Sequence, residues 1–146
     1  MDFWLAVLMR WAHVAAAVVG VGSTILFRFV VLPAISKLSE PEAALAAIRP
    51  GFKRVIHSAI GLLLLTGFYN YMVLAIPRVA AAGEKMKAYH PVMGVKIILS
   101  LVLFGVAMAL LSQAPAFHKR RNTWLTVNSV LGLVILLLAA FLRRLW

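Results

Sequence analysis

An arginine and a histidine lie three residues apart inside a long apolar run near the start of the chain. Arg10 and His13 interrupt the stretch from Phe3 to Phe27, which is otherwise largely apolar. A helix rises about 1.5 Å per residue, so His13 would lie near the middle of a bilayer about 30 Å thick. An ionisable side chain there costs about 2.5–3.5 kcal/mol unless a partner compensates it, and such residues mark functional sites. His13 is therefore the first candidate ligand for a metal or a haem iron.

The composition indicates that helices in a lipid bilayer position these residues. Hydrophobic residues make up 64% and charged residues 13% of the 146-residue chain, against about 45–50% and about 25% in soluble domains. We therefore expect a single integral-membrane domain over residues 1–146. The net charge of +11 does not indicate nucleic-acid binding, because the Lys and Arg residues bracket the apolar runs as they do beside anionic headgroups. The absence of Cys excludes thiolate metal sites.

Four apolar segments are long enough to span the bilayer, at about 20 residues each. The sequence predicts them at Phe3–Val31 ending at Pro33, at Val55–Ile76 closed by Pro77, at Pro91–Leu111 and at Trp124–Leu145. In the first connection, Ser39 and Glu42 have the spacing of a capping box, which predicts a short interfacial helix over Pro41–Ile48. The fold class we expect is all-α, a four-helix transmembrane bundle with this short interfacial helix in the first loop.

An even number of spans places both termini on one side of the membrane, together with the 77–90 connection. We call this side A, and the opposite side, with the 33–53 and 113–121 connections, side B. Outside the spans, side A carries five Lys or Arg residues and side B seven: Arg78, Lys85, Lys87, Arg143 and Arg144 against Lys37, Arg49, Lys53, Arg54, Lys119, Arg120 and Arg121. The positive-inside rule then favours side B as the cytoplasmic side.

Polar residues from three spans converge in the A-side half of this bundle. Arg10 and His13 enter from side A, Asn70 arrives there at the end of the second span, and Lys96 lies about 9 Å beyond His90 in the third. We expect Arg10, His13, Asn70, His90 and Lys96 to converge there, with His90 at the interface. Because the group contains cations and no carboxylate, a bound anion would supply the missing negative charge.

The helical face that continues from His13 carries only small residues: Ala16, Ala17, Gly20, Ser23 and Thr24. One interpretation is that another helix packs closely against this stripe. The other is a slot for a flat cofactor, and haem b fits it, with an imidazole for the iron and Arg10 and Lys96 for the two propionates. Lys96 has a second interpretation, as a residue that extends its ammonium group to the lipid headgroups.

His57 is the second candidate ligand. It lies near the side B end of the second span, at a depth that differs from that of His13 by roughly 10 Å. A haem held by both histidines would need a tilt or a shifted span boundary. The alternative interpretation is an interfacial residue among Lys53 and Arg54. In a copper protein, His13 and His57 would instead bind the metal in turn along a path through the bundle, and in a purely structural protein the polar residues would only join helices.

Several motifs resemble two related families, the CopD-type copper-resistance membrane domains and the HemJ-type protoporphyrinogen oxidases. The run from Trp11 to Ala17, with Gly20 to Phe27 and Leu32-Pro33, is similar to their first helix, and the stretches from Arg54 to Tyr69 and from His90 to Val102 are similar to their second and third helices. The resemblance implies a multi-pass protein of the inner (plasma) membrane.

The two branches imply different chemistry. In the HemJ-type branch the first-helix histidine serves haem and a third-helix lysine is needed for activity, and His13 and Lys96 match these positions. That branch also has an arginine about two turns before the lysine, where this chain has His90. The CopD-type branch implies copper import.

The sequence thus predicts a haem b-binding membrane redox protein, serving electron transfer or HemJ-like porphyrinogen oxidation. His13 would be the axial ligand and His57 the best second ligand, with Arg10, Lys96 and Asn70 around the cofactor. The alternative is a CopD-like copper transport or binding protein with the metal at His13 and His57. The partners we expect are the lipid bilayer, a redox protein and a second copy of the chain.

Overall fold

A computed structural model describes residues 3–83, 87–112, 117 and 119–144. Within these residues the chain forms helices and no strand. Four helical stretches, Phe3–Ile35, Pro41–Ala82, Tyr89–Leu111 and Arg121–Arg144, are long and apolar enough to cross a membrane. The prediction of an all-α bundle of four membrane-spanning helices is therefore confirmed. The last residue of the predicted fourth span, Leu145, lies outside the described residues.

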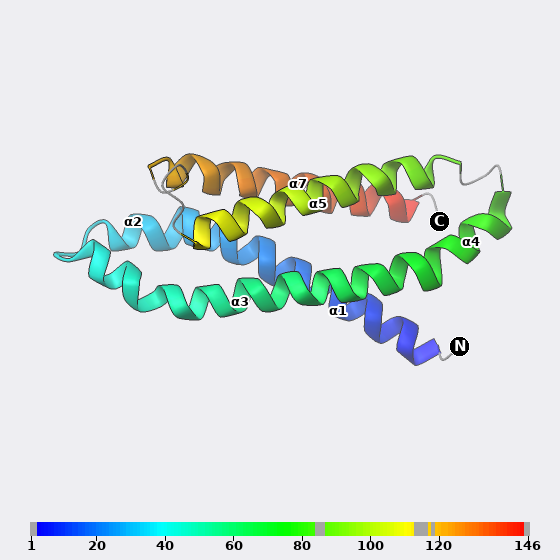
Figure 1. Cartoon of the computed structure of the whole chain (residues 1–146), viewed down its shortest axis with the longest axis horizontal. Helices are drawn as coiled ribbons and strands as arrows, with labels where there is room; N and C mark the ends of the chain where they lie inside the picture. Colours follow the sequence, from blue (N-terminus) through cyan, green and yellow to red (C-terminus); the bar gives the residue numbers. More distant parts are fainter. Residues whose placement is uncertain (1–2, 84–86, 113–116, 118, 145–146) are drawn as a thin grey trace.

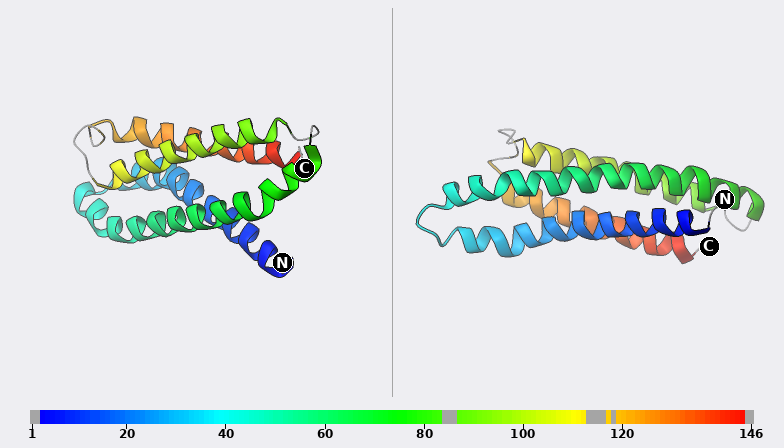
Figure 2. Two further views of the ribbon diagram at one scale, coloured as in Figure 1. Left: turned by 45° about the vertical axis from the view of Figure 1, so that its right-hand side comes forward. Right: turned by 90° about the horizontal axis from the view of Figure 1, so that it is seen from below.

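The helices form two antiparallel pairs (Figure 1). Helix α1 (Phe3–Leu26) packs against α3 (Pro41–Tyr69), and α5 (Tyr89–Leu111) packs against α7 (Arg121–Arg144). Contacts between α1 and α7 join the pairs. Both ends of the chain lie at the same end of the bundle as the α4–α5 connection, and the other two connections lie at the opposite end (Figures 1 and 2). This arrangement agrees with the predicted sides A and B.

Two prolines that were predicted to end spans instead lie inside continuous helices. The first span passes through the π-helix η1 (Phe27–Val31) into α2 (Leu32–Ile35), which contains Pro33. The second passes through the π-helix η2 (Asn70–Ala75) into α4 (Ile76–Ala82), which contains Pro77. Proline normally breaks a helix because it lacks an N–H and its ring meets the carbonyl four residues earlier. A π-helical turn shifts hydrogen bonding to a wider spacing just before each proline, so the helix continues.

The predicted interfacial helix over Pro41–Ile48 is helical, but it is not a separate element. These residues are the first turns of α3, which continues through Pro50 to Tyr69. The N-cap is Glu40 and has no side-chain capping hydrogen bond, so the predicted Ser39–Glu42 capping box does not form. The beginning of α3 is bent relative to the rest of the helix (Figure 1), as expected for a helix with proline in its interior.

The stripe of small residues on α1 lies at a helix–helix contact. Ala16 and Thr24 are buried, and a Cβ atom added at Gly20 would lie 3.6 Å from the Cβ of Ala59 on α3. Small residues let membrane helices approach closely. The van der Waals contacts made at this short distance stabilise helix pairs in lipid, where no hydrophobic driving force brings helices together. The structure therefore supports the packing interpretation of the stripe.

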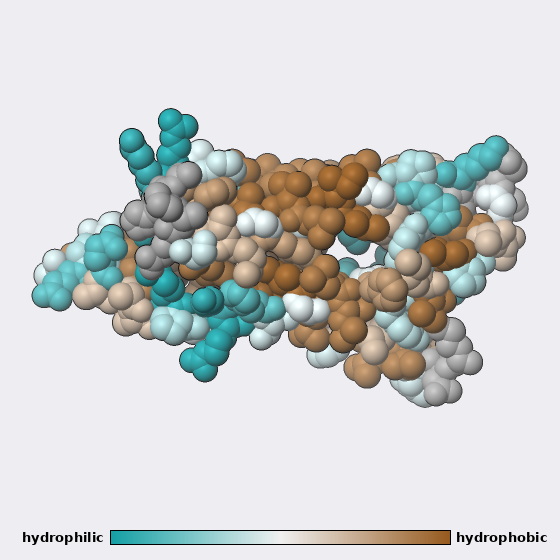
Figure 3. Space-filling view, viewed as in Figure 1, coloured by the Kyte–Doolittle hydropathy of each residue, from teal (hydrophilic) through white to brown (hydrophobic). Residues whose placement is uncertain are grey.

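The outer surface is apolar in the middle and polar at the ends. Large hydrophobic side chains are exposed along all four spans. Figure 3 shows a broad hydrophobic band across the middle of the bundle and hydrophilic side chains extending from the side B end. This distribution suits a lipid bilayer, whose hydrocarbon core is about 30 Å thick.

The closest approach of α1 to α7 gives a test of this packing. A Cβ added at Gly132 would lie 2.9 Å from both Cγ1 and Cγ2 of Val21, and valine is stiff at χ1. We expect Gly132→Val to destabilise the bundle by about 1–3 kcal/mol through overpacking. Thermal unfolding in detergent measures this effect.

Gly105→Val on α5 is the matched control, because nothing lies within 4 Å of a Cβ at that position. The second change Val21→Ala should restore part of the stability lost in Gly132→Val. Equal unfolding temperatures for the Gly132→Val and Gly105→Val proteins would contradict the close α1–α7 contact.

Candidate functional site

His13 meets α3 where a threonine and a glycine follow one another. The imidazole Nδ1 lies 2.9 Å from the Thr66 hydroxyl oxygen, and Thr66 is only 2% exposed. A Cβ added at Gly67 would lie 3.1 Å from Cε1 of His13. A side chain at position 67 would therefore press against the imidazole ring, and glycine leaves room for the ring to pack against α3.

The hydrogen bonds around Thr66 define the tautomer of His13. The Thr66 hydroxyl donates to the carbonyl of Leu62 one turn earlier, as hydroxyl side chains in helices often do. A hydroxyl has a single proton, so its oxygen must accept the hydrogen bond from His13. Nδ1 therefore carries the proton, and Nε2 of the neutral ring keeps its lone pair.

Lys96 is the charged neighbour of this imidazole. It lies on α5, is partly buried, and is close enough for its charge to act on His13. Within the described part of the chain, its ammonium group makes no hydrogen bond or ion pair. The acidic residues that the structure describes, Glu40 and Glu42, lie at the side B end. The site thus holds a positive charge that no described carboxylate balances.

The A-side half of the bundle is hollowed on the face seen in Figure 3. Figure 3 shows an opening between the α5–α7 pair and α3, with hydrophilic atoms visible in it. In the same half, the ribbons of α1 and α3 cross and the first turns of α1 extend away from the bundle (Figure 1). The exposed side chains of Trp4 and Trp11 lie on those turns. The first turns of α1 therefore diverge from the other helices in this half.

A hydrogen bond from Asn70 connects the second span to α1 next to the predicted site. Its side-chain nitrogen donates to the carbonyl of Met9 at 3.3 Å, directly before Arg10 in the chain. Its Oδ1 atom is buried and has no hydrogen-bond partner within the described residues. Asn70 is the first residue of η2, and Arg10 is exposed on α1. Asn70 and Arg10 therefore lie in the same half of the bundle as His13 and Lys96, as the sequence predicted.

His57 is not brought together with His13. It precedes Thr66, the partner of His13, by nine residues on α3, which corresponds to about 14 Å of helix. Its Nδ1 donates to the carbonyl of Lys53 at 2.7 Å. Imidazole nitrogens bind metals at about 2 Å, so the two rings do not share one ion. Among the described residues, no group of three or more His, Asp or Glu side chains is placed to hold a metal.

His90 belongs to a separate aromatic group at the side A surface. The Tyr71 hydroxyl lies 3.1 Å from Nδ1 of His90, and the Tyr71 and Tyr89 rings meet the imidazole edge to face. The ring is exposed. His90 therefore has the surroundings of a residue at the membrane interface.

The sequence reasoning did not assign Thr66 and Gly67 to the site. They entered only as part of the motif that resembles the two families. The local sequence shows only a threonine next to a glycine inside an apolar run. This pattern does not indicate which neighbouring helix the two residues face. We call His13, Thr66, Gly67, Asn70 and Lys96 the A-side site.

The A-side site combines three chemical capabilities. A neutral imidazole with a free Nε2 can bind a transition metal or accept a proton. An ammonium group without a carboxylate attracts an anion, and it does so strongly at low dielectric. The buried Oδ1 of Asn70 can accept a hydrogen bond from a ligand or from water. Comparison with protein-family models, with curated proteins and with solved structures gave no match for this chain.

Proposed function

We propose that the chain is a haem b-binding redox protein of the inner (plasma) membrane, with His13 as its protein ligand to iron. The observation that carries the proposal is the His13–Thr66 hydrogen bond, which leaves Nε2 with its lone pair. Metal-binding histidines usually donate their other ring N–H to an acceptor that orients the ring. When bound, haem would supply one-electron redox chemistry.

Lys96 and Arg10 would bind the propionates. A cation within a membrane span costs about 2.5–3.5 kcal/mol unless it is compensated, and Lys96 has no carboxylate partner among the described residues. Two propionates would bring two negative charges to this half of the bundle. Haem would bring its own two carboxylates, which suits a chain with only four Asp or Glu residues.

The HemJ-type resemblance supports this proposal more than the CopD-type resemblance does. His13 and Lys96 match the histidine and lysine of the HemJ-type pattern, and both belong to the A-side site. Copper import would use His13 and His57 in turn, and these lie about 14 Å apart along the helix axis. Within the proposal, haem bound at this site would supply electron exchange with a redox partner or with a porphyrinogen substrate.

Replacing His13 tests the ligand directly. We expect the purified wild-type protein to show a Soret band that sharpens on reduction with dithionite, with about one haem per chain. His13→Ala should lose the haem, because the described residues offer no other imidazole at this depth. His57→Ala is the matched control and should keep it. An unchanged haem content in His13→Ala, or copper in place of iron by metal analysis, would contradict the proposal.

Replacing Thr66 tests the orientation of the ring. Thr66→Val keeps the shape of the side chain and removes the acceptor for Nδ1–H of His13. We expect haem affinity to fall by about 10–100-fold, the usual effect of losing such a supporting hydrogen bond. Thr66→Ser retains the hydroxyl and should stay near the wild-type affinity. Haem titration of the apoprotein measures both, and equal affinities for Val and Ser variants would show that the hydroxyl has no such role.

Replacing Lys96 separates anion binding from iron ligation. Lys96→Met keeps a long apolar side chain and removes the ammonium group. We expect about tenfold weaker haem binding, within the 1–2 kcal/mol scale of a single partly buried charge interaction. The absorption spectrum of the haem that still binds should stay the same, because His13 is intact. A changed spectrum with unchanged affinity would assign Lys96 to the iron side of the cofactor instead.

A further inference from the structure

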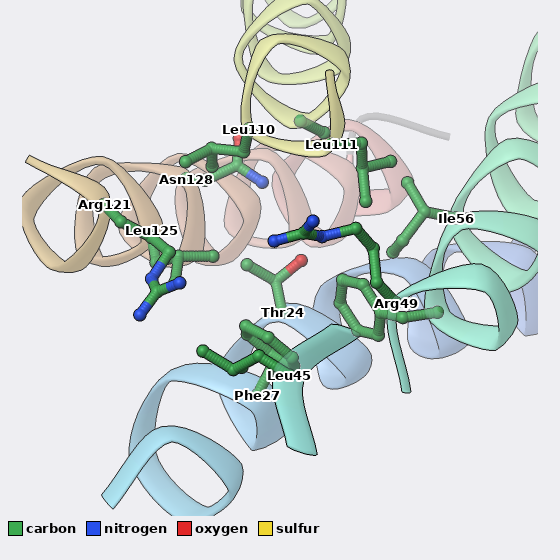
Figure 4. A pocket seen from close by; sticks show the side chains of 12 residues that line it. Thr24, Phe27, Leu45, Arg49, Ile56, Leu110, Leu111, Arg121, Leu125 and Asn128 are labelled. Atoms are coloured by element: carbon green, nitrogen blue, oxygen red, sulfur yellow. The ribbon is translucent and has the colours of Figure 1, made fainter. Parts of the chain in front are cut away.

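The side B half of the bundle contains a second polar site, formed by residues that the proposed haem site does not use. A cavity of about 60 Å³ lies between the helices there. Thr24 from α1, Arg49 from α3 and Arg121 and Asn128 from α7 contribute its polar walls (Figure 4). The volume exceeds that needed for a single water molecule, so the cavity has room for a small polar group.

Two arginines approach this cavity from different helices. In Figure 4 the guanidinium group of Arg49 extends into the space beside Thr24, and that of Arg121 lies next to Leu125 on the other side. The described residues that line the cavity include no Asp or Glu. Glu42 lines an adjoining groove that also contains Arg121. The cavity wall itself is therefore positively charged.

One donor and one acceptor in this wall have no hydrogen-bond partner in the part of the chain that the structure describes. The Nε atom of Arg121 and the Oδ1 atom of Asn128 are buried and make no hydrogen bond within the described residues. Asn128 is only 3% exposed. A buried polar group without a hydrogen bond costs about 1–3 kcal/mol, so such atoms call for a ligand or an ordered water. A single ligand for both must carry an acceptor atom and an O–H or N–H donor, and two arginines in the wall favour a neutral hydroxyl over a cationic N–H group.

We propose that the cavity binds a phosphate group that also bears a hydroxyl, as in the phosphoglycerol headgroup of an anionic lipid or in hydrogen phosphate. The phosphate oxygens accept hydrogen bonds from Arg121 and Arg49, because guanidinium groups match phosphate geometry. The hydroxyl donates to Oδ1 of Asn128. Apolar side chains, among them the stacked rings of Phe27 and Phe52, line the same cavity, and basic pockets between helices near the cytoplasmic face are typical sites for anionic headgroups.

Native mass spectrometry with defined lipids tests the site. The protein is exchanged into detergent, and phosphatidylglycerol, phosphatidylcholine and phosphatidylethanol are added separately. We expect wild type to retain phosphatidylglycerol over phosphatidylcholine, and Arg121→Gln to lower this retention about fivefold. Arg120→Gln is the matched control, because it removes the same charge from an exposed neighbouring residue and should leave retention unchanged. Arg49→Gln serves as an independent second variant if Arg121→Gln does not fold.

The hydroxyl and the source of the phosphate have their own tests. Phosphatidylethanol is anionic and lacks the hydroxyl, so wild type should retain it less than phosphatidylglycerol, and Asn128→Leu should retain the two equally. Inorganic phosphate at millimolar concentration should raise the unfolding temperature of wild type and not of Arg121→Gln if the site takes free phosphate. Equal retention by Arg121→Gln, Arg49→Gln and Arg120→Gln, with no effect of phosphate on any of them, would overturn the proposal.

Discussion

The close approach of α1 to two other helices is the contact on which the rest of the structure depends. Val21 lies against Gly132 on α7, Gly20 against Ala59 on α3, and His13 against Gly67 on α3. Each contact places a side chain on one helix opposite a small residue on the other. Because α1 makes the most extensive contact between the α1–α3 and α5–α7 pairs, these contacts influence how far the two pairs can separate.

Hydrogen bonding in the bundle follows from the lack of water in the hydrocarbon core. The hydroxyls of Thr24, Thr66 and Ser129 donate to carbonyls one turn earlier in their own helices, so each satisfies its proton locally. Such a hydroxyl still has a free lone pair, and the Thr66 oxygen offers its own to His13. Buried atoms that have no hydrogen-bond partner among the described residues occur in both halves, at Asn70 on one side and at Arg121 and Asn128 on the other. The molecule therefore has two chemically different places where a ligand would satisfy its polar groups.

The number of spans, and which connections share an end of the bundle, could be predicted from the sequence, because they follow from hydropathy and from counting turns. Pro33 and Pro77 misled the prediction, since the π-helical turns before them depend on backbone hydrogen bonds that local sequence does not specify. The role of Thr66 could not be predicted, because it depends on how α1 and α3 rotate about their axes. The sequence predicted a difference in depth of roughly 10 Å between His57 and His13, and in the structure the separation along the helix axis is about 14 Å.

The π-helix η2 also has a consequence for helical phase. A π-helical turn accommodates an additional residue, and one residue of an α-helix corresponds to a rotation of about 100°. The side chains of α4 therefore point in directions rotated from those they would have if α3 continued as a regular α-helix. This rotation brings Ala75 and Val79 to Tyr89 and Leu142 in the core at side A. Removal of a single residue from the 70–75 segment would return the helix to regular α geometry and turn Val79 toward lipid, while leaving the hydropathy of the span almost unchanged.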